Sequence, residues 1–228
     1  MKLSREVALT IDDRQVKAVQ GERLLWVALD NGVYIPHLCD LREAERTVAS
    51  CRLCFVEVEG LRGPVASCTL PVSEGMVVKT RSPMVDRLVR TGFELLLSNH
   101  RLNCAKCAKN KHCELQKIAK ERGLKLKLTR LRSLLQEAPI DESPATFSYD
   151  AGKCVLCGRC IWADQEQVGI GAIGFIRRGI ARKVATFEDG CLADSICTQC
   201  EACVKVCPVG ALYFKVDELQ LYKLKKKC

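Results

Sequence analysis

Cysteine is the residue whose abundance and spacing could do chemistry in this chain. Sixteen of the 228 residues are cysteines, several times the usual share in a globular protein. Most of them stand two residues apart in short runs, a spacing that aims several thiolates at one metal centre. The sequence contains no apolar stretch of membrane-spanning length and no secretory signal. We therefore expect a cytoplasmic protein whose thiols bind metal rather than form disulfides.

The most specific run lies near the C-terminal end, where Cys197, Cys200, Cys203 and Cys207 precede Pro208. This C-x2-C-x2-C-x3-C-P spacing is that of bacterial ferredoxins, in which the fourth cysteine ligates the other of two clusters. The other three thiols must come from an earlier run. We predict one [4Fe-4S] site made of the following cysteines: Cys154, Cys157, Cys160 and Cys207.

The second site of this repeat lacks an obvious fourth ligand. By symmetry the ligand follows Cys160 after a gap of three residues, and that position is Asp164. A carboxylate is a harder ligand than a thiolate. The alternatives are Cys191 as the ligand, a three-iron cluster, or an Asp164 that only caps a helix beside no cluster. We predict a [4Fe-4S] site with Asp164 or Cys191 completing this set: Cys197, Cys200 and Cys203.

The N-terminal part carries Cys39, Cys51, Cys54 and Cys68, separated by gaps of eleven, two and thirteen residues. Plant-type ferredoxins bind a [2Fe-2S] cluster through C-x4-C-x2-C and a distant fourth cysteine. The present spacing is that scheme with a longer first gap. Four thiolates also suit structural zinc, but the surrounding strand pattern favours the [2Fe-2S] interpretation.

A further set lies between these segments and consists of His100, Cys104, Cys107 and Cys113. By itself the set is typical of a zinc site. Its place between two iron-sulfur segments instead predicts a [4Fe-4S] cluster in which one neutral imidazole replaces a thiolate and raises the potential. His37 and His112 also lie near cysteines, and we expect both to be polar neighbours rather than ligands.

Hydrophobic periodicity indicates the elements that must position these residues. Alternating residues predict strands near 7–11, 16–19, 55–59 and 76–79, and residues 24–29 show helical spacing, which together is the order of a β-grasp domain. Ser82 and Pro83 begin a helix that ends near residue 99, and 114–122 form a second short helix. The predicted fold class is α+β, in five parts: a [2Fe-2S] domain at 1–80, a His/Cys3 domain at 81–122, a linker at 123–150, a two-cluster ferredoxin domain at 151–216 and a basic tail at 217–228.

The net charge of +9 would also suit a zinc-rich protein that binds nucleic acid. The aromatic content of 5% is low for stacking on single strands, and the basic residues are spread out apart from 125–132 and the tail. Oxidised clusters with their thiolates subtract roughly six or seven charges. The surplus lysine and arginine therefore mostly offset cluster charge, and we expect no nucleic-acid partner.

The ordered motifs resemble the N-terminal iron-sulfur region shared by the large iron-sulfur subunit of complex I and [FeFe]-hydrogenases. They also resemble the small diaphorase subunits of NAD-linked hydrogenases. The resemblance implies one [2Fe-2S] cluster, one His-ligated [4Fe-4S] cluster and up to two ferredoxin-type [4Fe-4S] clusters. It is carried by these segments: YIPHLC at 34–39, CRLCFVEVEG from 51, NHRLNCAKCAKNKHCELQ from 99, KCVLCGRC from 153 and CTQCEACVKVCPVGAL from 197.

The resemblance also implies a role. No catalytic domain follows residue 215 in this sequence, so we expect a subunit that is not catalytic by itself and that passes single electrons within an NAD(P)(H)-linked oxidoreductase. The implied partners are a flavin and NAD(H)-binding diaphorase subunit and a catalytic subunit of hydrogenase or formate dehydrogenase type, with ferredoxin as a further partner. An electron-bifurcating hydrogenase or a transhydrogenase complex is the expected setting.

Overall fold

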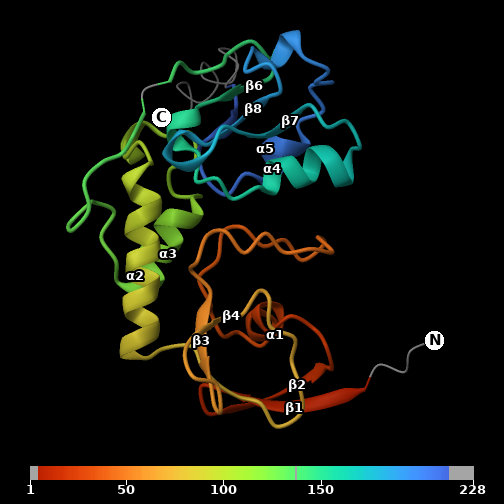
Figure 1. The fold of residues 1–228 in the computed structure, drawn as a ribbon, viewed down its shortest axis with the longest axis vertical. Coiled ribbons are helices and arrows are strands. Elements are labelled where there is room, and N and C mark those ends of the chain that lie inside the picture. The colour runs from red at the N-terminus through yellow and green to blue at the C-terminus, as the bar shows by residue number, and fades with distance from the viewer. Residues whose placement is uncertain (1–4, 137, 216–228) are drawn as a thin grey trace, which may run out of the picture. The chain divides into compact units, whose positions relative to one another are not determined.

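The computed structural model describes residues 5–136 and 138–215. The chain divides into two compact units, coloured along the chain in Figure 1. Unit 1 contains residues 1–98 and 117–133, and unit 2 contains residues 99–116 and 134–228. The predicted linker 123–150 is thus shared between the two units. The predicted basic tail, including Cys228, lies outside the described residues.

Unit 1 is built on a five-stranded sheet with the strand order β2-β1-β5-β3-β4. β1 and β5 run parallel, whereas β1 pairs antiparallel with β2, and β3 pairs antiparallel with both β4 and β5. The four predicted strands are confirmed, and β4 is an additional strand. The bounds are β1 Glu6–Ile11, β2 Arg14–Val19, β3 Phe55–Val58, β4 Val65–Ala66 and β5 Val77–Lys79.

The β1–β2 turn and the core of unit 1 follow from simple rules. Asp12 and Asp13 have φ angles of 46° and 65°, the left-handed conformation that a two-residue hairpin turn requires and that aspartate tolerates. Alternate residues of β1 are buried against helix α1 (Leu24–Asp30), which confirms the predicted helix. Cys54 and Cys68 belong to the same buried cluster. Two cysteine thiols of the N-terminal set are therefore part of the hydrophobic core.

Helix α2 (Pro83–Ser98) begins where the sequence predicts it. The Ser82 hydroxyl accepts a hydrogen bond from the Val85 N–H (3.2 Å) and donates one to Glu57 (2.7 Å), so it both caps the helix and ties it to β3. One face of α2 is buried through Val85, Val89, Phe93 and Leu97. Farther along the chain, Thr129 and Arg130 donate hydrogen bonds to Glu94 of α2 at 2.7 and 2.9 Å.

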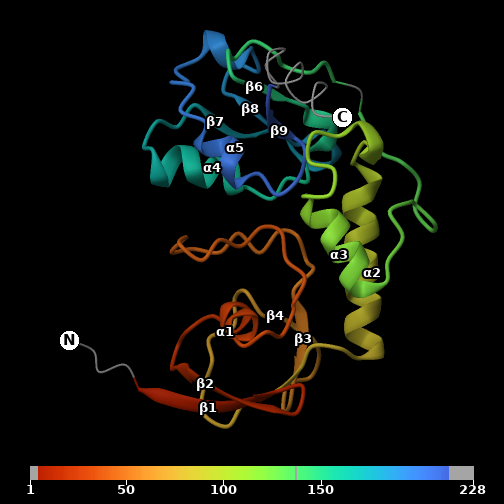
Figure 2. The same ribbon diagram turned by 180° about the vertical axis from the view of Figure 1, so that it is seen from behind.

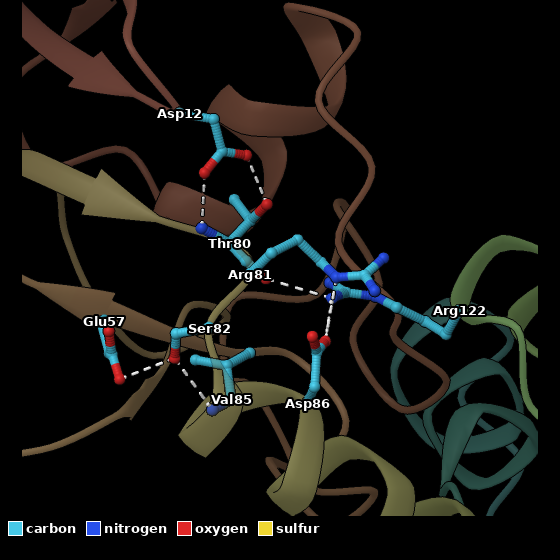
Figure 3. Close-up of polar contacts among 8 residues, drawn as sticks. All are labelled: Asp12, Glu57, Thr80, Arg81, Ser82, Val85, Asp86 and Arg122. Atoms are coloured by element: carbon cyan, nitrogen blue, oxygen red, sulfur yellow. Dashed lines mark hydrogen bonds and ion pairs between the residues drawn. The ribbon is translucent and has the colours of Figure 1, made fainter.

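A polar network joins the elements of unit 1 (Figure 3). The Thr80 N–H and hydroxyl donate to the Asp12 carboxylate at 2.8 and 2.5 Å. Arg122, near the end of helix α3 (Glu114–Arg122), donates to the Thr80 carbonyl (3.1 Å) and to Asp86 of α2 (3.2 Å). This buried arginine thereby fixes the chain between β5 and α2 against the end of α3.

Unit 2 contains two small antiparallel sheets, β6–β9 and β7–β8, and two short helices. Figures 1 and 2 show α4 and α5 side by side. Helix α4 continues directly into a π-helical turn, Ala163–Gln167. Among the described residues, no helix has the length and apolar character needed to cross a membrane. The bounds are β6 Phe147–Tyr149, α4 Arg159–Trp162, β7 Ile173–Ile176, β8 Lys183–Thr186, α5 Ala202–Val206 and β9 Leu212–Phe214, with short 3-10 turns at Cys104–Lys106, Ala151–Lys153, Gly179–Ala181 and Leu192–Asp194.

Candidate iron-sulfur sites

The four N-terminal cysteines lie together in unit 1, all at least 96% buried. They form two close pairs. The Sγ atoms of Cys39 and Cys51 are 3.5 Å apart, and the thiols of Cys54 and Cys68 also share a hydrogen bond. Two thiolates on one tetrahedral metal ion, with bonds of about 2.3 Å, stand roughly 3.8 Å apart. The arrangement fits a two-iron cluster with one cysteine pair on each iron.

The thiols of this set shift one another's pKa values. Their shared hydrogen bond lowers the pKa of Cys39 to about 6, and it raises the pKa of Cys51. Burial further raises the pKa of Cys51 and of Cys54. Because several buried thiolates repel one another, a cation is needed before all four can be ionised together. The set therefore suits a bound metal cluster.

Helix α2 closely approaches the loop that carries Cys51 and Cys54. Arg52 has a φ of 54°, which turns the chain sharply between the two cysteines. A Cβ atom at Gly92 would lie 2.7 Å from the Arg52 carbonyl oxygen, so only glycine allows this contact. Sequence reasoning assigned no role to Gly92, because nothing local marks a glycine in mid-helix as a packing contact.

The His/Cys3 set lies in unit 2. The buried Nδ1 of His100 has no hydrogen-bond partner in the part of the chain that the structure describes. Burial lowers the pKa of His100 and keeps the imidazole neutral, which is the form that binds metal. A Cβ atom at Gly210 would collide with Cys107 Sγ, so this glycine leaves the room that the thiol occupies. The unpaired, buried Nδ1 of His100 and the room that Gly210 leaves for the Cys107 thiol fit a cluster. Its ligands would be His100, Cys104, Cys107 and Cys113.

The first ferredoxin-type set lines one enclosed cavity. Cys154, Cys157, Cys160 and Cys207 all face it, together with Tyr149 and apolar side chains such as Val209 and Leu212. Burial raises the pKa of Cys154 to about 11 and that of Cys157 to about 12. These thiols are neutral at pH 7 until a metal replaces their protons. The structure thus gathers the predicted set, including the distant Cys207.

The second ferredoxin-type set lines a separate cavity of unit 2. Its walls include Cys197, Cys200, Cys203 and Asp164, closed by apolar residues such as Phe147 and Ile173. Burial raises the pKa of Cys203 to about 12. Cys191 is exposed and is absent from these walls; it lines a neighbouring cavity of about 370 Å³. Of the two predicted fourth ligands, Asp164 shares a cavity wall with all three cysteines, whereas Cys191 shares the neighbouring cavity with Cys203 alone.

The two ferredoxin-type loops have the same backbone conformation. In the first, Leu156 and Gly158 have φ angles of 52° and 80°; in the second, Gln199 and Glu201 have 54° and 65°. In each loop the N–H two residues after the first cysteine donates to that cysteine's Sγ at 3.4 Å. Left-handed residues between the cysteines let a short loop turn its thiols to one side. The internal repeat predicted from cysteine spacing is therefore a repeat of structure.

These features define the class. Unit 1 holds paired thiols suited to a two-iron cluster, and unit 2 holds repeated cysteine loops of ferredoxin type. No three His, Cys, Asp or Glu side chains within residues 5–136 and 138–215 are arranged to hold a single metal ion. The chain is an iron-sulfur protein built from small mixed helix and strand domains.

Three family models match the chain. A 2Fe-2S iron-sulfur cluster binding domain matches residues 4–83, the NADH-ubiquinone oxidoreductase-G iron-sulfur binding region matches 90–126, and the NADH-quinone oxidoreductase subunit 3 ferredoxin-like domain matches 145–213. The models support a [2Fe-2S] cluster in the N-terminal part and [4Fe-4S] clusters beyond it.

Known proteins agree with these models. The chain is 36% identical to the NADP-reducing hydrogenase subunit HndD of Solidesulfovibrio fructosivorans, over 90% of this chain and 36% of the relative. It is 35% identical to an NADH-quinone oxidoreductase subunit of Rhizobium meliloti, over 90% of this chain and 24% of the relative. It therefore spans well under half the length of these curated relatives.

A solved structure matches this chain over most of the length of both proteins. One chain in the crystal structure of an NAD+-reducing [NiFe]-hydrogenase in the H2-reduced state superposes with a TM-score of 0.82 at 34% identity. The match covers 92% of this chain and 88% of that one. The chain belongs to the family of iron-sulfur proteins shared by complex I and hydrogenases, which confirms the resemblance found in the sequence.

Proposed function

We propose that this chain is the electron-transfer subunit of a multi-subunit NAD(P)(H)-linked oxidoreductase and conducts single electrons through four iron-sulfur clusters. The proposal rests on how the potential metal ligands of the chain are grouped in the structure. Fourteen of the sixteen cysteines, one histidine and one aspartate fall into four sets, and each predicted set is complete within one unit.

The proposed ligand sets follow the sequence prediction. Cys39 and Cys51 hold one iron and Cys54 and Cys68 the other iron of a [2Fe-2S] cluster. The remaining sets each hold a [4Fe-4S] cluster. They are His100, Cys104, Cys107 and Cys113; Cys154, Cys157, Cys160 and Cys207; and Cys197, Cys200 and Cys203 with a fourth ligand considered below.

When bound, the clusters supply reversible one-electron redox chemistry. The protein fixes their positions and adjusts their potentials. The Leu156 and Gln199 N–H groups each donate a hydrogen bond to a cysteine sulfur, which stabilises the more negative, reduced form and so raises the potential. A neutral His100 in place of a thiolate acts in the same direction. In the first ferredoxin-type cavity, apolar walls help to bury Cys157, Cys160 and Cys207.

The proposed partners are a flavin and NAD(H)-binding subunit and a catalytic subunit of hydrogenase or formate dehydrogenase type, with ferredoxin as a further partner. The names of two relatives, an NADP-reducing hydrogenase subunit and an NAD+-reducing hydrogenase, support this assembly. An electron-bifurcating hydrogenase or a related complex is the setting that we favour.

The test is anaerobic purification followed by iron, zinc and sulfide analysis and by EPR of the reduced protein. One two-iron and three four-iron clusters predict about fourteen iron atoms per chain. A colourless protein that contains stoichiometric zinc instead would refute electron transfer. Affinity purification of the tagged chain from its own host then tests the partners, and a flavoprotein that binds NAD(H) should co-purify.

A further inference from the structure

The two ferredoxin-type repeats exchange their last ligand-bearing position. Cys207 stands four positions after Cys203, yet it lines the cavity of the first loop. Asp164 stands four positions after Cys160, and it lines the cavity of the second loop. Asp164 is thus the structural counterpart of Cys207, which we place as an iron ligand. The structure puts a carboxylate where this pseudosymmetry requires a metal ligand.

The backbone holds Asp164 in place. Helix α4 widens into the π-helical turn Ala163–Gln167, closed by a hydrogen bond from the Val168 N–H to the Ala163 carbonyl (3.0 Å). Such turns are rare and often occur at functional sites. Asp164 is only 8% exposed, and its Oδ2 accepts a hydrogen bond from the Ile173 N–H at 3.0 Å. One oxygen therefore anchors the carboxylate.

The other oxygen lacks a partner. Among the described residues, Oδ1 of Asp164 makes no hydrogen bond or ion pair. The cavity walls contain a second acidic residue, Glu201, and no lysine, arginine or histidine. Oδ1 is not among the buried polar atoms that lack a partner, so this oxygen is accessible to a ligand. A metal ion bound between Asp164 and the three thiolates would supply the missing positive charge.

The rival ligand is placed elsewhere. The residue after Cys191 is held by a hydrogen bond from the Leu192 N–H to Asp141 at 2.8 Å. Cys191 and Asp141 line the neighbouring cavity of about 370 Å³, whose walls include Cys203 but not Cys197, Cys200 or Asp164. Of the two candidate ligands, only Asp164 shares one cavity wall with all three of these cysteines.

From this geometry we propose that Asp164 is the fourth ligand of the cluster at Cys197, Cys200 and Cys203, and that the iron it binds can be removed and exchanged for another divalent metal. The proposal rests on the four-cluster function given above. A single carboxylate oxygen is a harder and more labile iron ligand than a thiolate. The site would therefore keep three irons firmly, through its cysteines, and one loosely.

The exchange step balances. With a [4Fe-4S]²⁺ cluster held by Cys197, Cys200, Cys203 and Asp164, release of the iron that Asp164 would hold, as Fe²⁺, would leave a [3Fe-4S]⁰ cluster on the three cysteines. Ferricyanide then takes one electron to give [3Fe-4S]⁺, which is visible by EPR. Added Fe²⁺, after reduction, restores the original cluster. Co²⁺ or Zn²⁺ added instead would give a mixed-metal cluster. Both ions generally bind such sites more tightly than Fe²⁺ does.

The experiment compares the full-length protein with Asp164→Cys, Asp164→Ala and Cys191→Ala after treatment with ferricyanide and EDTA. The unmodified protein and Cys191→Ala should each lose about one of about fourteen irons and gain about one [3Fe-4S] spin per chain. Asp164→Cys should retain its iron and give no such signal. Asp164→Ala should show the [3Fe-4S] signal as purified, without treatment.

The controls separate the possible failures. EPR signals of the [2Fe-2S] and His-ligated clusters report whether each variant has folded, and Asp164→Asn replaces any variant that has not. If only Cys191→Ala shows the three-iron signal as purified, or if the unmodified protein keeps all its iron under treatment, the assignment of Asp164 is wrong although the electron-transfer function stands. A chain that contains no clusters at all refutes the function itself.

Discussion

Replacing Gly92 of helix α2 by alanine has two opposing effects on the stability of the protein, and the sign of the net change shows which is larger. Replacing a glycine in a helix interior by alanine stabilises the helix by roughly 0.8–1 kcal/mol. In this chain, however, the new Cβ would stand 2.7 Å from the Arg52 carbonyl oxygen, about 0.7 Å closer than ordinary contact at 3.4 Å. The oxygen belongs to the backbone between Cys51 and Cys54, so it cannot rotate out of the way.

The steric effect should outweigh the gain in helix propensity. Inserting a methyl group into a close-packed contact destabilises a protein by roughly 1–3 kcal/mol. The net effect of Gly92→Ala is a loss of roughly 0–2 kcal/mol, which lowers the midpoint of thermal unfolding by up to roughly 8 °C for a chain of this size. Because the strain falls on the cluster loop, the [2Fe-2S] signal should also change while the [4Fe-4S] signals do not.

The assay combines EPR of the reduced protein with thermal unfolding at one fixed scan rate, since cluster loss makes unfolding irreversible. Leu95→Ala is the matched control, because Leu95 lies three residues further along the same helix and is 55% exposed. It should change neither measurement appreciably. A rise of roughly 2–4 °C for Gly92→Ala, with an unchanged [2Fe-2S] spectrum, would refute the proposed contact between the helix and the loop.

Three further changes test other parts of the structure. Cys207→Ala should remove the reduced [4Fe-4S] signal of the first ferredoxin-type cluster, with or without a [3Fe-4S] signal in its place, and spare the second cluster; the opposite result would contradict the exchange of Cys207 and Asp164 between the two loops. Gly210→Ala should alter the signal of the His-ligated cluster, because its Cβ would collide with Cys107 Sγ; an unaltered signal would show that Cys107 lies elsewhere. Arg122→Ala should lower the midpoint of thermal unfolding at the same scan rate by roughly 2–12 °C, which corresponds to roughly 1–3 kcal/mol, because it leaves the Thr80 carbonyl without its arginine partner; a change below about 2 °C would mean that water replaces the guanidinium.

The sequence alone determined the features that depend on neighbouring residues. Period-two burial predicted β1 and β2, and Ser82 with Pro83 predicted the start of α2, because alternation and capping act over a few residues. The cysteine runs predicted metal-binding loops for the same reason, since gaps of two residues limit where the thiols can point. The two-residue strand β4 escaped prediction because it is too short to show a period.

Only the tertiary structure decided which distant residues meet. It joins residues 99–116 to the ferredoxin-type part in unit 2 and places Gly210 against Cys107 and Gly92 against Arg52. It also puts Asp164, and not Cys191, in the wall beside Cys197, Cys200 and Cys203. Spacing along the chain left both residues within reach of that site. The π-helical turn and the Ile173 hydrogen bond bury the Asp164 carboxylate beside the three cysteines, an arrangement that spacing alone does not predict.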